Sequence, residues 1–354
     1  MNDIPNGDFL ICDADSVAFK AAAANEKRRI RTVHIEKGIP ETWDHRTAFR
    51  TYLATTNHTE DMYTIEDIQE PKHLDFGKKL VREMLQGYSQ RTGITARKIY
   101  ISGDDNFRDL IPLPAEYKPT INKRAGTDPV WAGAYKNKRE GNIRPVQLKE
   151  LRAYMQSDLG AIPVHGMEVD DMSSILAWDG FRGGWKAVQV TEDKDAAQCS
   201  GWLFNPAKDK APRFIQGFGE LHREIKKGKE ADVKGSGRVW LYFQALYGDD
   251  VDCYHGADLW KIEQDKAGKK ITFGEVAAYN LLKDCKTDKE ALQIVHDQYL
   301  AWYPTTQVYV DCFGVVQSKD HIEMMQMYFD CAHMRRWKDD RIDVKAMLTK
   351  MGII

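Results

Sequence analysis

The stretch Phe9–Asp15, FLICDAD, is a short apolar run that ends in two aspartates. Three further runs have the same form: Lys98–Ser102, Ile162–His165 and Ala187–Thr191. Each lies just before one or more carboxylates, and helical patterns alternate with the runs. This alternation is typical of an α/β domain. The sequence therefore predicts an α/β fold with a mostly parallel central sheet flanked by helices.

The rest of the chain is expected to form helices and two long insertions. The predicted helices are Val17–Arg29, Pro145–Leu159, Val169–Trp178, Phe273–Cys285, Asp288–Trp302 and His321–Trp337. The basic run Glu26–Arg31 is expected to end the first helix, where cations suit the dipole. Residues 30–73 interrupt the pattern as an insertion with a β-like piece, and residues 112–144 are too long for an ordinary connection. We place the α/β domain at residues 1–247 and a helical region at residues 248–354.

Charge and cysteine content exclude several classes of protein. The 354 residues include 51 Lys and Arg against 53 Asp and Glu, so the chain is not a polycation that coats nucleic acid. Its six cysteines are scattered without C-x-x-C pairs, which indicates reduced thiols in a cytoplasm. The longest uncharged stretch, Gln298–Val310, is short and contains Pro304, so no membrane-spanning helix is expected. We expect a cytoplasmic protein with no membrane partner.

Acidic residues gather where the predicted strands give way to helices. They form five clusters: Asp13 with Asp15, Asp104 with Asp105, Glu168 with Asp170 and Asp171, Asp193 with Asp195, and Asp249 with Asp250 and Asp252. Open α/β sheets bind ligands beyond the carboxyl ends of their strands, so we expect these clusters to converge. Carboxylates that close together cannot all ionise without a cation. Oxygen ligands with no competing Cys/His set predict two Mg²⁺ or Mn²⁺ ions able to act on a phosphodiester.

One segment is strongly basic. Tyr117–Arg152 contains nine basic residues against three acidic ones, in a chain whose total charge is −2. The basic residues are Lys118, Lys123, Arg124, Lys136, Lys138, Arg139, Arg144, Lys149 and Arg152. Tyr117, Trp131 and Tyr135 place aromatic rings among them. A phosphate backbone needs cations and unpaired bases need aromatic faces, so the segment predicts nucleic-acid binding, although a solvated basic loop could have the same composition.

The motifs also follow a particular order. D-x-D (Asp13–Asp15) is followed by Gly-Asp, Phe-Arg, Y-K-x-K-R (Tyr135–Arg139), a helix begun by Pro145, G-x-E-x-D-D (Gly166–Asp171), D-K-D and G-D-x-x-D. This order resembles the 5′-nuclease (flap endonuclease) superfamily, with its PIN-like fold, over roughly residues 9–256. Within that superfamily the chain is most similar to the bacteriophage 5′→3′ exonucleases, which implies the cytoplasm of a host cell.

The resemblance implies two metal sites. It places four residues around one ion: Asp13, Asp104, Glu168 and Asp170. It places five others around the second ion or its waters: Asp171, Asp193, Asp195, Asp249 and Asp252. Asp105 is the alternative to Asp104, and Asp15 could contact metal directly or through water.

The resemblance also implies an arch or gateway over the site, at about residues 112–160. Lys136 and Arg139 would steer the scissile phosphate while Tyr135 stacks on the terminal base; Tyr117 is the alternative to Tyr135. The further DNA-binding cations are Lys118, Lys123, Arg124, Lys138 and Arg144. Residues 248–354 would grip the duplex downstream with a K⁺ ion, although the glycine-rich hairpin of the family's grip is not obvious in this sequence.

The function expected is that of a two-metal 5′→3′ exonuclease or flap endonuclease. Its partners would be duplex DNA with a 5′ end or flap, and RNA in RNA–DNA hybrids, with the protein acting as a monomer. A haloacid-dehalogenase-like phosphatase, with Asp13 as nucleophile, is one alternative, but it gives Glu168–Asp171 and the basic segment no role. A nucleic-acid binder without catalytic metals is the other; such a protein would be expected to have lost some acids, and every matching position here is acidic.

Overall fold

The computed structural model describes residues 7–117, 131–132, 135–136, 143–226, 228–268 and 273–354. The chain divides into two compact units. The larger unit comprises Met1–Asp13, Arg91–Asn142 and Pro163–Ile354, and the smaller unit comprises Ala14–Gln90 and Ile143–Ile162.

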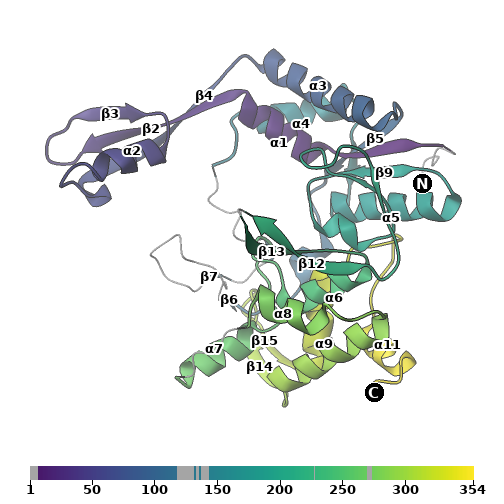
Figure 1. Cartoon of the computed structure of the whole chain (residues 1–354). Helices are drawn as coiled ribbons and strands as arrows, with labels where there is room; N and C mark the ends of the chain where they lie inside the picture. The colour runs from purple at the N-terminus through teal and green to yellow at the C-terminus, as the bar shows by residue number, and fades with distance from the viewer. Residues whose placement is uncertain (1–6, 118–130, 133–134, 137–142, 227, 269–272) are drawn as a thin grey trace. The chain divides into compact units, whose positions relative to one another are not determined.

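A six-stranded sheet organises the larger unit (Figure 1). Its strands, in the order in which they lie side by side, are β11 (Arg213–Ile215), β10 (Gly201–Phe204), β9 (Ala187–Val190), β1 (Phe9–Asp13), β5 (Arg97–Ser102) and β8 (Ile162–Val164). Strand β1 is parallel to both β5 and β9, β9 is parallel to β10, and β11 is antiparallel to β10. The predicted α/β class with a mostly parallel sheet is confirmed.

Helix α5 (Val169–Gly183) packs on this sheet against β1, β9 and β10. Ile175 of the helix shares a buried apolar cluster with Phe9 of β1. Gly180 permits α5 to approach β9 closely, because a Cβ atom at this position would lie 2.7 Å from the Cβ of Ala187 in β9. Since α5 begins just after β8, its first turn is held at the carboxyl end of the sheet.

The smaller unit combines helices with a separate sheet. The helices α1 (Ala14–Ala24), α3 (Leu74–Thr92) and α4 (Leu148–Ser157) belong to it, with α1 packed on α4. The strands β3 (Pro40–Trp43), β2 (Glu26–His34) and β4 (Tyr63–Pro71) form an antiparallel sheet in that order. Helix α2 (Arg46–Leu53) and a 3₁₀ turn, η1 (Glu60–Met62), complete the insertion predicted at residues 30–73.

The basic run Glu26–Arg31 lies in strand β2, so the prediction that it ends a helix is wrong. Helix α1 stops at Ala24, and from Ile30 onward buried residues alternate with more exposed ones. Alternation of buried and exposed residues with a period of two is the pattern of a strand. It outweighs the expectation that these cations stabilise the end of a helix. The cations pair instead with acids on the same unit, as Lys27 does with Asp44.

The rest of the larger unit is mainly helical, with short hairpins. Its helices are α6 (Arg238–Tyr247), α7 (Asp258–Lys266), α8 (Glu275–Leu282), α9 (Asp288–Trp302), α10 (His321–Ala332) and α11 (Val344–Lys350). Its paired strands are β6 (Glu116–Tyr117) with β7 (Trp131–Ala132), β12 (Glu220–Lys226) with β13 (Lys229–Ser236), and β14 (Gln307–Val310) with β15 (Val316–Lys319). Two 3₁₀ turns, η2 (Phe107–Leu110) and η4 (Asp195–Gln198), lie near the sheet.

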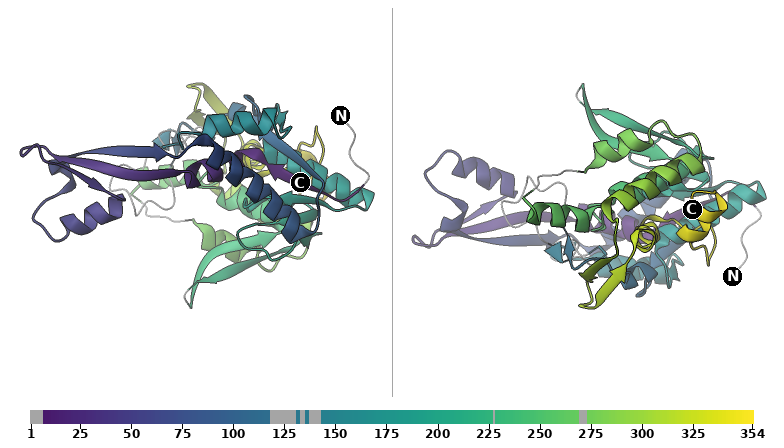
Figure 2. Two further views of the ribbon diagram at one scale, coloured as in Figure 1. Left: turned by 90° about the horizontal axis from the view of Figure 1, so that it is seen from above. Right: turned by 90° about the horizontal axis from the view of Figure 1, so that it is seen from below.

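The predicted boundary between residues 247 and 248 falls inside one apolar core. Trp240 and Phe243 of α6 share this core with residues of α8, α9 and α10, such as Tyr299 and Phe329. These helices lie side by side in Figure 1 and in the second view of Figure 2. Because α6 precedes the predicted boundary and its packing partners follow it, residues 248–354 are not a separate compact unit.

Candidate metal centre

Carboxylates meet at the carboxyl ends of two adjacent strands. Asp13 is the last residue of β1, and Asp193 follows the neighbouring strand β9. Glu168 is the N-cap of α5, and Asp170 lies in the first turn of that helix. After β1, the chain forms β5 and β8 on one side of β1. It then crosses over and forms β9 on the other side of β1. Such a switch point is where open α/β sheets bind ligands.

The tightest group of carboxylates consists of Asp195, Asp249 and Asp252, which offer ligand oxygens that all lie within 4.8 Å of one another. Asp195 begins η4, and the other two belong to the turn that follows α6. A backbone bridge between Asp249 and Tyr254 closes this turn. Gly248 makes the turn possible, because its φ is +94° and a Cβ atom there would lie 2.0 Å from the carbonyl oxygen of Tyr254.

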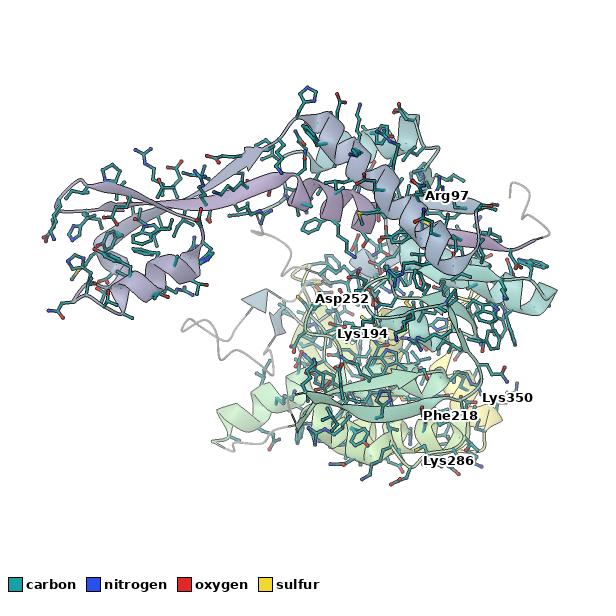
Figure 3. The ribbon with its side chains drawn as sticks, turned by 45° about the horizontal axis from the view of Figure 1, so that its top comes forward. Arg97, Lys194, Phe218, Asp252, Lys286 and Lys350 are labelled. Atoms are coloured by element: carbon teal, nitrogen blue, oxygen red, sulfur yellow. The ribbon has the colours of Figure 1, made fainter. Side chains whose placement is uncertain are left out.

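The charges of this first group repel one another. Burial raises the pKa of the Asp195 carboxyl well above its ordinary value, and the charge of Asp193 raises it further. Asp249 and Asp252 add to the repulsion, while Lys194 offsets part of it. Lys194 forms an ion pair with Asp249 at 2.7 Å, and Figure 3 labels it near Asp252. The raised pKa indicates that one ammonium does not neutralise the group.

A second group surrounds Asp170. Burial raises the pKa of the Asp170 carboxyl well above its ordinary value. The charges of Asp193, Asp13 and Glu168 raise it further, in that order, and Lys136 opposes them. Asp193 thus acts on the carboxyl groups of both Asp170 and Asp195. The charge of Asp193 therefore couples the two groups.

Tyr135 and Lys136 reach both groups from the basic segment. The Tyr135 hydroxyl lies 3.2 Å from a carboxylate oxygen of Asp252 and 3.4 Å from one of Glu168, and can donate its proton to either. The Lys136 ammonium pairs with Glu168 and lies 4.0 Å from Asp252. The Tyr135 ring is only 8% exposed and stacks on Tyr254, which leaves the hydroxyl at the centre and does not favour the expected role of the ring in stacking on a base.

Asp171 is not placed to bind a metal, contrary to the prediction. Its carboxylate accepts two hydrogen bonds from the Arg108 guanidinium, at 2.5 and 3.0 Å, and two more from the backbone N–H groups of Arg335 and Glu168. Burial by itself would raise the pKa of Asp171, but the adjacent Arg108 outweighs burial and holds the pKa below its ordinary value. All four acceptor positions of Asp171 are therefore taken by donors of the protein.

The loop after β5 reaches the centre through an amide. Asp104 and Asp105 are exposed, and Asp105 pairs with His165 at 3.1 Å. Asn106 donates to Glu168 at 3.2 Å. The contact of this loop with the centre is therefore made by a neutral side chain, Asn106. Asp104, which the resemblance places at a metal ion, is exposed and is not among the carboxylates that gather around Asp170 or Asp195.

No protein-family model and no curated protein matches this chain. The 5′-nuclease resemblance therefore stays a prediction, and the function has to be argued from the centre. Within the described residues, no helix is long and apolar enough to cross a membrane.

Four of the predicted DNA-binding cations lie outside the described residues: Lys118, Lys123, Arg124 and Lys138. Arg139, predicted to steer the scissile phosphate, lies outside them as well. Arg144 is described and exposed, and its backbone carbonyl accepts a hydrogen bond from Gln69 within the smaller unit. Asp15 also belongs to the smaller unit, where it pairs with Arg152.

Three residues that support the centre carried no distinct signal in the sequence. Gln244 of α6 donates to Asp195 at 2.5 Å, and Arg108 and Asn106 hold the acids at the start of α5. Arg108 belongs to the Phe-Arg motif, but nothing in the sequence paired it with Asp171. Lys194 belongs to the D-K-D motif, but nothing in the sequence paired it with Asp249.

Proposed function

We propose that the chain is a nuclease that depends on divalent metal ions. The observation that carries this proposal is the crowding of carboxylates at the centre: Asp195, Asp249 and Asp252 offer ligand oxygens within 4.8 Å of one another, and the charge of Asp193 raises the pKa of both Asp195 and Asp170. Active sites are where burial and like charges are arranged to shift pKa values. Two neighbouring cation sites are also what a two-metal displacement at phosphorus requires.

The residues fit two Mg²⁺ or Mn²⁺ ions. Both groups offer carboxylate oxygens, the ligands that hard cations prefer. Asp195, Asp249 and Asp252 would hold one ion. Asp13, Glu168 and Asp170 would hold the other, with Asp193 shared. The bound ions would supply an activated water and neutralise charge on the phosphate.

Lys136 would act on the substrate, while Lys194 and Tyr135 would position the carboxylates. The Lys136 ammonium contacts Glu168 and Asp252, one carboxylate from each group, and would stabilise negative charge on a phosphodiester held between them. Lys194 is paired with Asp249 on the first group and would keep that carboxylate oriented. The Tyr135 hydroxyl lies within hydrogen-bond distance of the same two acids, Glu168 and Asp252, and would help to fix their positions.

We further propose that the substrate is DNA cleaved from its 5′ end, with RNA in RNA–DNA hybrids as a second substrate. The nine basic residues of Tyr117–Arg152 support nucleic acid as the partner. The 5′ polarity is supported by the order of motifs that resembles the 5′ nucleases. The phosphatase alternative leaves Asp193 and Asp195 without a role.

The test is cleavage of 5′- and 3′-labelled duplex, flap and single-stranded DNA, with Mg²⁺ or with EDTA. We expect release of short products from the 5′ label only when the metal is present. Asp193→Asn should abolish cleavage while the variant still binds DNA. The matched control is Asp284→Asn, the same change at an exposed aspartate between α8 and α9, which should cleave like the wild type.

Each alternative predicts a different result from these assays. Full cleavage by Asp193→Asn would refute the assigned centre. A covalent phosphate trapped on Asp13 would establish the phosphatase instead. DNA binding without cleavage, in any divalent metal, would establish a binder.

A further inference from the structure

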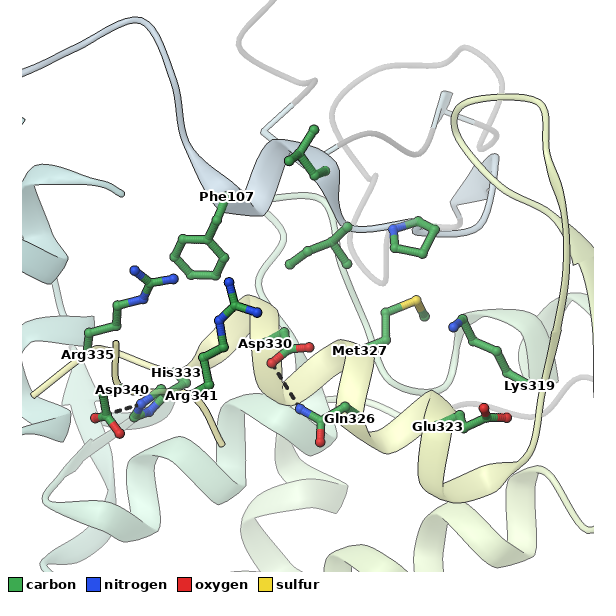
Figure 4. A pocket seen from close by; sticks show the side chains of 13 residues that line it. Phe107, Lys319, Glu323, Gln326, Met327, Asp330, His333, Arg335, Asp340 and Arg341 are labelled. Carbon is green, nitrogen blue, oxygen red and sulfur yellow. Dashed lines mark hydrogen bonds and ion pairs between the residues drawn. The ribbon is translucent and has the colours of Figure 1, made fainter. Parts of the chain in front are cut away.

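A cavity of about 490 Å³ lies beside η2 and α10 in the larger unit (Figure 4). Leu110, Ile111, Pro112 and Met327 form an apolar wall. Basic side chains, among them Arg335, line other parts of the cavity. The volume falls in the range of small-molecule sites, which combine apolar walls with a few polar groups. None of the carboxylates proposed to hold metal lines this cavity.

Arg335 is a buried cation with too few partners. It is 6% exposed, and its Nε atom has no hydrogen-bond partner among the described residues. One terminal nitrogen donates to the carbonyl of Lys338 at 3.2 Å, and the guanidinium stacks on the Phe107 ring, 3.9 Å from its centroid. Burial lowers the pKa of Arg335, and the charges of Arg108 and Arg341 lower it further, although Asp171 opposes them. A buried guanidinium in this state is stabilised by any anion that reaches it.

A second guanidinium faces the same space. Arg341 is exposed and, like Lys319, forms no ion pair with any residue in the described ranges. Figure 4 shows the Arg341 and Arg335 side chains extending toward the same side of the cavity, near Phe107. Two guanidinium groups in this arrangement offer several N–H donors to one oxyanion.

The carboxylates around the cavity already have donors within the protein. Asp340 accepts from His333 at 3.0 Å and from Arg336 at 2.8 Å. Asp330 accepts from Gln326 at 3.0 Å, and Glu323 accepts from the backbone N–H of Asp320 at 2.9 Å. The acids therefore have donors within the protein, while the Nε atom of Arg335 has no hydrogen-bond partner among the described residues, which favours an anion as the ligand of the cavity.

We propose that this cavity binds a phosphate monoester carried on an apolar body of nucleoside size, with Arg335 and Arg341 on the phosphate and the apolar wall against the body. The choice of a nucleoside monophosphate rests on the proposed function, because these are the products that an exonuclease releases. The anion site itself rests on the buried Arg335 guanidinium, whose Nε atom has no hydrogen-bond partner among the described residues, and on Arg341 beside it, and does not depend on nuclease activity.

The test is calorimetric titration of the full chain in EDTA, so that no metal at the carboxylate centre can hold phosphate. The ligands are deoxyadenosine 5′-monophosphate, deoxyadenosine, inorganic phosphate and a short 5′-phosphorylated oligonucleotide. We expect the monophosphate to bind at least about tenfold more tightly than deoxyadenosine or phosphate alone, since each of these keeps half of the contacts. Tighter binding of the free monophosphate than of the oligonucleotide would identify the free nucleotide as occupant, and the reverse would identify a strand end.

Two variants assign the site. Arg341→Gln, at an exposed position, should weaken binding of the monophosphate about tenfold or more. Lys345→Gln makes the same change of charge on α11, away from the cavity, and should bind like the wild type. No binding of either phosphorylated ligand, or binding that Arg341→Gln leaves unchanged, would overturn the proposal. Normal binding by a chain that cleaves no DNA would overturn the nuclease and leave this site standing.

Discussion

Replacing Arg108 by leucine should destabilise the larger unit strongly, because Arg108 is the partner of a buried charge. The side chain is 1% exposed, and Asp171 is fully buried beside it. Arg108 donates to both oxygens of Asp171, to the Cys331 carbonyl at 3.1 Å and to the His333 carbonyl at 2.6 Å. Removing one partner of a buried ion pair costs about 3–5 kcal/mol. We expect Arg108→Leu to lose about that much of its free energy of unfolding.

A second substitution separates the charge from the lost packing. Asp171→Asn removes the unpaired charge but keeps an oxygen that can accept from the Arg335 backbone N–H. In the wild type it should destabilise, because it weakens the pair with Arg108. In the Arg108→Leu background it should stabilise, by about 2 kcal/mol, because no charge is then left buried without a partner. This change of sign is the diagnostic result.

The assay is urea unfolding followed by tryptophan fluorescence. Trp43 is the only tryptophan of the smaller unit, so the signal reports mainly on the larger one. Arg182→Leu, at an exposed arginine of α5, is the matched control and should change the free energy of unfolding by less than about 0.5 kcal/mol. If Asp171→Asn destabilises both backgrounds equally, the two side chains do not act as a buried charge pair and the reasoning is refuted.

Three further variants test the centre and its surroundings. Asp195→Asn removes a charge from the repelling group, so it should raise the free energy of unfolding in EDTA by about 0.5–2 kcal/mol. The variant should also lose the stabilisation that Mg²⁺ gives the wild type. A lower melting temperature of the variant in EDTA would contradict the proposed repulsion. Gly248→Ala should cost at least about 2 kcal/mol and reduce cleavage, because its Cβ would meet the Tyr254 carbonyl, whereas Gly314→Ala, at φ +79° in open space, should cost only about 1 kcal/mol. Burial raises the pKa of Asp258 from 3.8 to about 6, so the folded state binds the extra proton and the wild type should lose up to about 3 kcal/mol as the pH rises from about 4 to 7. Asp258→Asn should lack that loss, and parallel pH profiles for the two proteins would show the shift to be absent.

The sheet could be predicted because its strands are marked by local sequence. β1, β5 and β9 are short apolar runs, as strands buried on both faces should be. Helix α6 could not be found in the same way. Its sequence, RVWLYFQALY, is buried at nearly every position and so lacks the period of 3.6 that marks an amphipathic helix. Because the sequence does not mark α6 as a helix, it also gives no sign that α6 packs with the C-terminal helices, and the predicted boundary at residue 247 separates them.

The acidic positions were predicted more completely than their roles. Strand ends and the G-D-x-x-D turn brought Asp13, Asp193 and Asp249 to one place, as the α/β pattern requires. Spacing on α5 suggested that Asp171 shares a task with Glu168. Its actual partner, Arg108, lies 63 residues earlier in the chain, and a pairing over that distance depends on the fold.

The residues Asn106, Phe107 and Arg108 join features that are separate in the sequence. Asn106 contacts Glu168 at the metal centre, Phe107 supports Arg335 at the anion cavity, and Arg108 holds Asp171. The backbone N–H of Arg335 also donates to Asp171 at 3.2 Å, which ties the segment after α10 to the first turn of α5. Because packed interiors transmit displacements, η2 cannot move to suit a ligand in the cavity without moving the side chains that position Glu168. An anion at Arg335 and a cation at Glu168, if both bind as proposed, would thus be supported by one short turn, whose position the buried Arg108–Asp171 pair sets.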